Sequence, residues 1–321
     1  MKEIYLASGC FWGAEHYFRN IDGVVDTEVG FANGDAGLTS PTYEQVYTDT
    51  TGYAETVRVI YNPDALPLDE LIRDFFCAID PLSVNKQGED EGTRYRTGVY
   101  YTDEDDLSVA CEVFEEIQAG LSGPLAVELE PLRNFYPADG RHQDYLIKNP
   151  DGYCHLPLKI FRYPRLVSDL GHLLGNEPDK MARLSNAAAL IKERMGFFWT
   201  GFYLVGDADA SGSVGVHAHG GASADGKELV LGPFQGPSAC MRIGYGRGVC
   251  GTAWKEARTV VVEDVEEFPG HIACSSSSRS EIVVPMFMDG QVIGVLDIDS
   301  TEVATFDAVD AFWLERLVKK I

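Results

Sequence analysis

Cys10 lies in the segment Gly9-Cys10-Phe11-Trp12-Gly13, at the point where a short β-like run meets a predicted helix. A cysteine in this place can act as a nucleophile, because the amides and dipole of a helix N-terminus stabilise the thiolate and lower the thiol pKa. The same half of the sequence contains acids and phenols that could work with a thiol: Glu15, Tyr43, Glu55, Asp90 and Tyr95. A cysteine beside aromatic residues is also common in protein cores, so the segment alone leaves a structural role open.

A second set of cysteines lies in the other half of the chain: Cys240, Cys250 and Cys274, within GPSACMRI, GRGVCGTAW and GHIACSSSS. Together with His271 they could bind zinc. However, no pair has the short Cys-x-x-Cys spacing of the usual zinc knuckle, so zinc is the weaker interpretation.

Three carboxylates follow these cysteines. Asp297 and Asp299 are two residues apart, so their side chains project from the same face of a predicted strand, and Glu281 begins the partner strand. Such a group is either a solvated edge or an anionic recess suited to an ammonium group. Trp199 and Tyr203, four residues apart, could form its aromatic wall.

Alternating elements in the first half predict an α+β or α/β domain. Residues 4–7 and 55–61 have strand character, and residues 14–20, 68–78 and 104–119 have helical character. We place this domain at residues 1–163. Two prolines and two glycines then indicate a linker over residues 164–178.

Residues 179–321 form the second predicted domain, an antiparallel sheet with flanking helices. Helical patterns cover residues 179–195 and 307–320, and short strands cover residues 198–205 and 228–231. The turn pair Asp289-Gly290 predicts a hairpin over residues 281–299. Residues 206–226 are rich in Gly, Ala, Ser and Asp and predict a long loop, in which His217 and His219 are poorly placed to bind a metal.

Composition excludes several classes of protein. The 321 residues carry a formal net charge of −24, which disfavours binding to nucleic acid. Because no apolar run reaches the roughly 18 residues of a membrane span, and no signal peptide is recognisable, we expect a soluble, cytoplasmic protein without membrane contact. Seven widely spaced cysteines suit a reducing compartment.

The first half resembles peptide methionine sulfoxide reductase A. The blocks GCFWGAEHYF, PTYEQV, GYAETV, EDEGTRYRTGVY and HQDYLIKNPDGYCH match that family in order. The resemblance implies that Cys10 is the nucleophile, that Glu55 is a protonated acid with a raised pKa, and that Cys154 resolves the sulfenic acid as a disulfide. It further implies a methyl pocket and polar groups around the sulfoxide oxygen: Phe11 and Trp12, and Tyr43, Asp90 and Tyr95. Tyr53 stands where the family frequently has histidine, which could shift substrate preference.

The second half resembles the free methionine-(R)-sulfoxide reductases, which are GAF domains with redox cysteines. The blocks LVLGPFQGPSACMRI, GRGVCGTA, VEDVEEFPGHIACSSSSRSEIVVP and GQVIGVLDIDS carry this likeness. It implies Cys274 as nucleophile and Cys240 as resolving thiol, with Cys250 able to take part in either step. Glu281, Asp297 and Asp299 would hold the ammonium of the free amino acid, and Trp199 would cover the S-methyl group. Residues 206–226 are longer than the family's hairpin.

The two resemblances together predict a fusion that reduces methionine-(S)-sulfoxide, free and in proteins, and free methionine-(R)-sulfoxide. Such an enzyme binds no cofactor or metal but needs an external dithiol reductant of the thioredoxin kind. In the main alternative, the second half is a ligand-sensing GAF domain without catalysis. In a weaker one, Cys10 is the nucleophile of a Cys/His hydrolase, for which no histidine has a suitable sequence context.

Overall fold

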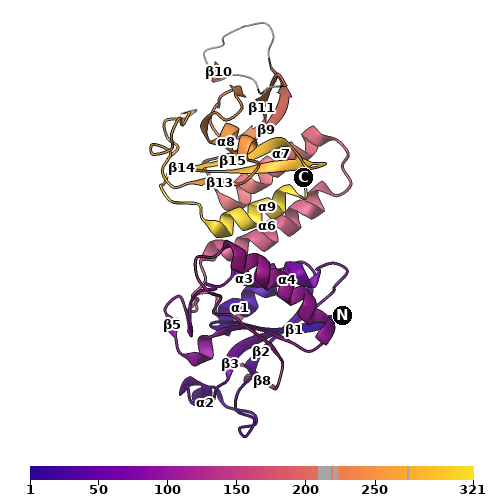
Figure 1. Ribbon diagram of the computed structural model, residues 1–321, viewed down its shortest axis with the longest axis vertical. Coiled ribbons are helices and arrows are strands. Elements are labelled where there is room, and N and C mark those ends of the chain that lie inside the picture. The colour runs from indigo at the N-terminus through magenta and orange to yellow at the C-terminus, as the bar shows by residue number, and fades with distance from the viewer. Residues whose placement is uncertain (209–217, 220–222, 224, 273–274) are drawn as a thin grey trace. The chain divides into compact units, whose positions relative to one another are not determined.

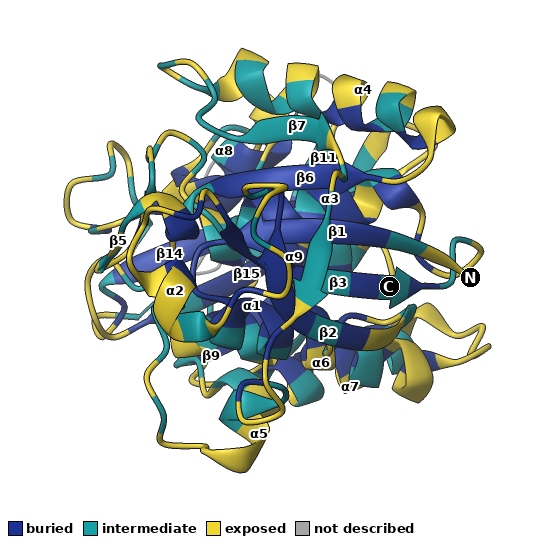
Figure 2. Ribbon diagram, turned by 90° about the horizontal axis from the view of Figure 1, so that it is seen from below, coloured by how far each residue is buried: buried dark blue, intermediate teal, exposed yellow. Residues whose placement is uncertain are grey.

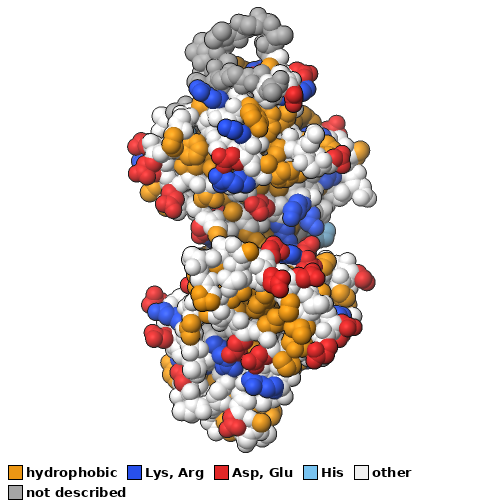
Figure 3. Space-filling view, in the orientation of Figure 1, with side chains coloured by type: hydrophobic (Ala, Val, Ile, Leu, Met, Phe, Trp, Pro, Cys, Tyr) orange, Lys and Arg blue, Asp and Glu red, His pale blue; other side chains and the backbone are white. Residues whose placement is uncertain are grey.

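The computed structural model describes residues 1–208, 218–219, 223, 225–272 and 275–321. The chain divides into two compact units, Met1–Pro164 and Arg165–Ile321, and each is described by itself. Within the described ranges, no helix is both long and apolar enough to cross a membrane. On the face drawn in Figure 3, acidic side chains are spread among basic and apolar ones on both units.

The first unit is built on a six-stranded sheet in the order β7-β6-β1-β3-β2-β8. All neighbouring strands are antiparallel except β6 and β7, which are parallel. The strands are β1 (Lys2–Ser8), β2 (Val24–Ala32), β3 (Ala54–Tyr61), β6 (Thr97–Tyr101), β7 (Glu128–Pro131) and β8 (Phe135–Pro137), and a separate ribbon pairs β4 (Lys86–Gln87) with β5 (Asp90–Glu91).

Helices pack on this sheet and on one another: α1 (Phe11–Phe18), α2 (Tyr43–Tyr47), α3 (Leu68–Cys77), α4 (Glu104–Gly120) and α5 (Tyr145–Lys148), with a 3₁₀ turn at Thr93–Tyr95. Figure 2 shows β1 and β6 buried along most of their length, while the outer side of α4 is exposed. Helix α1 packs against β2 and β3, which brings its N-terminus beside the buried end of β3.

The second unit contains a seven-stranded sheet in the order β10-β12-β11-β9-β15-β14-β13. Figure 1 shows helices flanking this sheet. The strands are β9 (Trp199–Asp207), β10 (Ala218–His219), β11 (Lys227–Gln235), β12 (Arg242–Ile243), β13 (Val260–Val262), β14 (Ser280–Met288) and β15 (Gln291–Ser300), and the helices are α7 (Lys180–Met195), α8 (Gly248–Glu256) and α9 (Ala308–Val318). Neighbouring strands are antiparallel except β10 and β12, which are parallel, so the predicted antiparallel sheet with flanking helices is confirmed.

The predicted hairpin at Asp289-Gly290 is also confirmed. Both turn residues have positive φ, 51° and 76°, as a two-residue turn of the twisted hairpin type requires, and Met288 pairs with Gln291. This turn sets the pairing next to it, and a register shift between Met286 and Phe287 changes the pairing farther along β14 and β15. Most of the predicted loop at residues 206–226, including His217, lies outside the described residues.

The segment that we predicted as a linker is helical over most of its length. Helix α6 (Leu158–Leu174) contains the boundary between the units and has Pro164 in its interior. Buried residues recur at helical spacing through the segment: Tyr163, Leu166, Val167, Leu170 and Leu174. Burial of this stripe outweighs the cost of the internal proline, which local sequence alone suggests should end the helix.

Candidate active sites

Cys10 sits in a tight turn between β1 and α1. Gly9 has φ of 79°, a left-handed conformation that favours glycine, and a Cβ atom there would lie 2.7 Å from Cβ of Gln87. Cys10 is the last residue before α1 and is 5% exposed. The thiol therefore lies at a helix N-terminus, as predicted, but it is buried.

Burial raises the pKa of the Cys10 thiol, whereas we predicted that the helix N-terminus would lower it. The pKa of Cys10 is raised well above its usual range, first by desolvation and then by the nearby carboxyls of Glu55 and Asp90. A hydrogen bond from the Trp12 backbone N–H opposes the rise without offsetting it. Our prediction that the helix N-terminus lowers this pKa is therefore wrong, because desolvation exceeds the effect of the helix dipole.

Glu55, on β3, is the buried acid of this site. Its side chain is 1% exposed, and its Oε2 accepts a hydrogen bond from the backbone N–H of Phe11 at 3.0 Å. Burial raises the pKa of Glu55 to about 8, while the Phe11 hydrogen bond and Arg94 act in the opposite direction. The predicted raised pKa is confirmed, so this carboxyl is largely protonated at neutral pH.

Two phenols share the pocket with this acid and thiol. Burial raises the pKa values of Tyr43 and Tyr95, and both Glu55 and Cys10 raise them further. Mutual electrostatic effects of this kind require the four side chains to lie close together. Both phenols therefore keep their protons at neutral pH and remain hydrogen-bond donors.

An aromatic wall flanks the thiol. The rings of Trp12 and Tyr145 stack with centroids 3.8 Å apart, and the Trp12 indole N–H donates to Nδ1 of His142 at 3.2 Å. The rings of Tyr43 and His142 also stack, with centroids 4.5 Å apart. A pocket of about 450 Å³ opens beside this wall. Sequence reasoning missed the contributions of His142 and Tyr145, although both lie in the block HQDYL.

Asp90, Cys154 and His155 complete the first site. Oδ2 of Asp90 lies 3.8 Å from Nδ1 of His155, and one donor atom each from Cys10, Asp90 and His155 lie within 4.8 Å of one another. Cys154 is a free thiol, and its Sγ accepts from the Leu156 backbone N–H at 3.4 Å. His155 was also missed from the sequence, where its position directly after Cys154 was the one available signal.

Glu15, named above among the acids that could work with a thiol, instead holds a neighbouring segment of the chain. It is 2% exposed, and its Oε2 accepts from the backbone N–H of Asp144 at 2.7 Å, just before α5. Burial raises the pKa of Glu15 to about 7. The residue thus anchors the segment that carries Tyr145.

Strand register builds the second site. Glu281 on β14 pairs with Asp299 on β15, and Asp299 pairs in turn with Trp199 on β9. Asp297 is opposite Gly201, where a Cβ atom would lie 2.4 Å from the Trp199 ring. Only glycine leaves room for that ring. The predicted clustering of Glu281, Asp297 and Asp299 is therefore confirmed, and we call these three residues the acidic recess.

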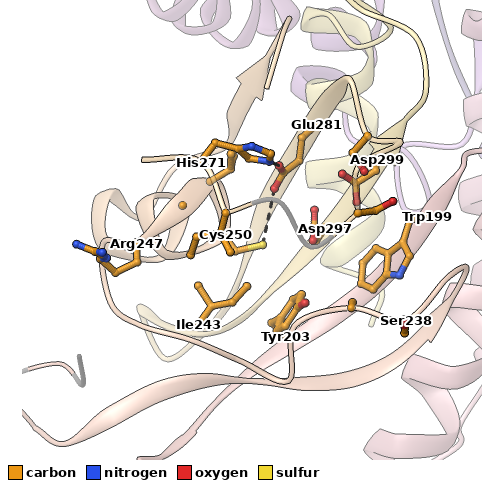
Figure 4. A pocket seen from close by; sticks show the side chains of 16 residues that line it. Trp199, Tyr203, Ser238, Ile243, Arg247, Cys250, His271, Glu281, Asp297 and Asp299 are labelled. Carbon is orange, nitrogen blue, oxygen red and sulfur yellow. Dashed lines mark hydrogen bonds and ion pairs between the residues drawn. The ribbon is translucent and has the colours of Figure 1, made fainter. Parts of the chain in front are cut away.

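The acidic recess is buried instead of forming a solvated edge. Figure 4 shows its side chains with Cys250, whose Sγ lies 3.9 Å from Oε1 of Glu281. Burial, and then the neighbouring carboxyls, raise the pKa values of Glu281 and Asp297 well above their usual range. Burial raises the pKa of Asp299 only to about 6. Asp299 is therefore the carboxyl of the acidic recess whose pKa burial raises least.

Aromatic residues and the remaining cysteines surround the acidic recess. The Trp199 and Tyr203 rings stack at 6.2 Å, as the predicted wall requires. The Tyr203 hydroxyl donates to the carbonyl of Cys240 at 2.9 Å, which holds that segment on the sheet. Cys240 is in a disulfide, so it supplies no thiolate to the zinc site considered above. Cys274, the predicted nucleophile, lies outside the described residues.

Two groups among the described residues have donor atoms close enough to share a metal ion: Cys10, Asp90 and His155, and Cys250, Glu281 and Asp297. Each lies inside one of the sites above. The expected absence of a metal stays a prediction.

Comparison with known proteins divides the chain in the same way. The family model described as peptide methionine sulfoxide reductase matches residues 2–169, and the model described as GAF domain matches residues 184–321. A protein named peptide methionine sulfoxide reductase MsrA, from Clostridium acetobutylicum, is 50% identical over 162 residues, which is 50% of this chain and 99% of the relative.

Solved structures resemble each half. The free methionine-R-sulfoxide reductase of Neisseria meningitidis, in complex with its substrate, is 49% identical over 49% of this chain and 84% of its own, with a TM-score of 0.43. Mxr1 from Saccharomyces cerevisiae, in reduced form, is 41% identical over 49% of this chain and 91% of its own, with a TM-score of 0.47.

Proposed function

The chain belongs to the peptide methionine sulfoxide reductase family and is a methionine sulfoxide reductase with a GAF domain, and from this premise we propose that its two units reduce opposite epimers. The first unit acts on methionine-(S)-sulfoxide, free or in proteins. The second acts on free methionine-(R)-sulfoxide. A site shaped for one hand of the sulfoxide sulfur does not accept the other, so two sites are needed.

In the first unit, the protonated Glu55 beside Cys10 is the observation that carries the proposal. Cys10 sulfur attacks the sulfoxide sulfur, and Glu55 gives its proton to the oxygen while Tyr43 and Tyr95 donate hydrogen bonds to it. The thiol proton of Cys10 passes to the Glu55 carboxylate, which restores the acid. The oxygen passes to Cys10, which becomes a sulfenic acid, and methionine leaves. Phe11 and Trp12 enclose the methyl group, and Asp90 is one of the polar groups around the sulfoxide oxygen.

Cys154 then closes the catalytic cycle. Its sulfur attacks the sulfenic sulfur of Cys10, a disulfide forms, and the oxygen leaves as water. An external dithiol of the thioredoxin kind reduces the disulfide by thiol exchange, and no bound cofactor takes part. We propose the same external reductant for the second unit.

In the second unit, the buried acidic recess supports recognition of a free amino acid. An ammonium group placed there meets three carboxyls, and Trp199 covers the S-methyl group. A methionine within a protein chain has no such ammonium, so the site favours the free amino acid. We propose Cys274 as the nucleophile and Cys240 as the resolving thiol, with Cys250 taking part in either step.

Burial of Cys10 and His155 disfavours a hydrolase at Cys10. His155 and Asp90 do lie beside the thiol, which supplies the residue types of a Cys/His hydrolase. However, such enzymes use a thiolate paired with a charged histidine, whereas burial raises the pKa of Cys10 and lowers the pKa of His155.

The test uses the full chain with purified free methionine-(S)-sulfoxide and methionine-(R)-sulfoxide, and with thioredoxin or dithiothreitol as reductant. Cys10→Ser should abolish turnover of the S epimer alone, and Cys274→Ser should abolish turnover of the R epimer alone. Cys111→Ser, an exposed position on α4, is the matched control and should change neither. Wild-type protein that turns over the S epimer but not the R epimer would make the GAF domain a ligand-sensing module.

A further inference from the structure

His155 has a buried imidazole that the proposed reaction does not yet use. Its side chain is 3% exposed, and neither ring nitrogen has a hydrogen-bond partner of good geometry within the described ranges. The Oδ2 atom of Asp90, 3.8 Å from Nδ1, likewise has none, although the Ser8 backbone interacts with His155 and the Tyr153 side chain interacts with Asp90. A buried imidazole without a well-formed hydrogen bond is costly, so an imidazole here needs a reason in the chemistry.

The imidazole lies close to both of the cysteines that must become a disulfide. A Cβ atom placed on Gly9 would be 3.5 Å from Nε2, so one end of the ring reaches the turn that carries Cys10. A Cβ atom on Gly13 would be 3.5 Å from Nδ1 and 2.9 Å from Sγ of Cys154. The Cys154 sulfur and the other end of the ring therefore share the space above Gly13.

Both groups have the protonation states that a proton transfer needs. Burial raises the pKa of Cys154, so at neutral pH it is a thiol, whereas only a thiolate attacks a sulfenic acid efficiently. Burial lowers the pKa of His155, so at neutral pH its imidazole is uncharged and has a free lone pair. Asp90 and the Ser8 backbone act in the other direction and favour the imidazolium once it forms.

We propose that His155 takes the proton from the Cys154 thiol and delivers it to the oxygen that leaves Cys10, a role that rests on the proposed function of the first unit. The Cys154 thiolate attacks the sulfenic sulfur, the S–S bond forms as the S–O bond breaks, and the departing hydroxide takes the proton from the imidazolium. One thiol and one sulfenic acid thus become one disulfide and one water. The Asp90 carboxylate stabilises the imidazolium between the two transfers.

The experiment separates the two chemical steps in a single turnover. Fully reduced full-length protein receives one equivalent of free methionine-(S)-sulfoxide without any reductant. Released methionine reports the first step, and the Cys10–Cys154 disulfide, measured in acid-quenched samples by peptide mapping, reports the second. Trapping with dimedone measures the sulfenic acid between the two steps.

For His155→Ala we expect methionine release at the wild-type rate, disulfide formation slowed at least tenfold, and accumulation of the dimedone adduct. Added imidazole should restore disulfide formation, because it can enter the space and carry the proton. His155→Asn, which keeps a polar side chain but cannot shuttle a proton at neutral pH, should show the same defect. His172→Ala, an exposed histidine on α6, is the matched control.

Two results would overturn the proposal: disulfide formation at the wild-type rate in both His155 variants, or a slowing of both steps together that imidazole does not relieve, which would indicate a structural role. Wild-type protein that releases no methionine would instead refute the proposed function itself.

Discussion

The backbone N–H of Phe11 donates to Oε2 of Glu55 at 3.0 Å, and this single contact joins the turn that carries the thiol to the acid on β3. Because Oε2 already accepts a hydrogen bond, the carboxyl proton belongs on Oε1. The contact therefore orients the acid as well as holding it. Residue 11 contributes its backbone to the acid and its ring to the methyl pocket, so the two parts of the site keep a fixed spacing.

The first prediction concerns the pH dependence of methionine release. With a pKa of about 8, Glu55 is protonated below that pH and loses its proton above it. Release of methionine from the S epimer should therefore be slower above pH 8, and Glu55→Gln should reduce it by about 10²-fold or more. Single-turnover rates from pH 6 to 9.5 measure both effects. Glu115→Gln, exposed on α4, is the control; a Glu55→Gln variant of wild-type rate would contradict the assignment.

The second prediction concerns stability. The pKa of Glu55 is higher in the folded protein than the ordinary value near 4.5, so between about pH 4.5 and 8 the folded state binds more protons than the unfolded state. The contribution of Glu55 to the free energy of unfolding is thus fully present below about pH 4.5 and is lost as the pH rises to about 8. Glu55→Gln, which stays neutral, should change the thermal midpoint of the first unit little at pH 5 and raise it at pH 8.5. A difference that does not depend on pH would exclude the buried neutral acid.

The third prediction concerns Gly13. A Cβ atom there would lie 2.9 Å from the Cys154 sulfur, so Gly13→Ala must displace that thiol. We expect normal methionine release in the first turnover and disulfide formation slowed several-fold. Steady-state turnover with thioredoxin should fall accordingly. Gly120→Ala on α4, where no atom lies within 4 Å of the new methyl group, is the matched control. Equal rates in the two variants would show that Cys154 acts from another position.

The fourth prediction concerns proton release at the acidic recess. Burial and the neighbouring carboxyls raise the pKa values of Glu281 and Asp297, whereas an incoming ammonium favours their ionised forms. Binding of free methionine-(R)-sulfoxide to the Cys274→Ser variant should therefore be accompanied by proton release. Calorimetry in buffers of different ionisation enthalpy measures the number of protons released. The N-acetylated ligand, which has no ammonium, should not bind; proton uptake would contradict the model.

Local sequence predicted the second site better than the first. The Asp289-Gly290 turn and the alternation of strand side chains predicted the hairpin that carries Glu281 and Asp299. They did not predict the register shift between Met286 and Phe287, which places these two residues opposite each other. At Cys10, a local argument from the helix N-terminus failed, because burial comes from distant segments. His155 carries no periodic or spacing signal that would reveal its contact with Asp90. Tertiary packing likewise keeps α6 helical through Pro164.

The boundary inside α6 also bears on how the chain folds during synthesis. Starting a helix is costly, since several residues are fixed before the first hydrogen bond forms, whereas each later residue adds a bond. Residues 158–164 emerge with the first unit and can form that nucleus, and residues 165–174 then extend it. Domains generally fold in order from the N-terminus. The part of α6 in the second unit can therefore extend from the helical turn already formed by residues 158–164 of the first unit. This happens before any strand of the second sheet has been synthesised.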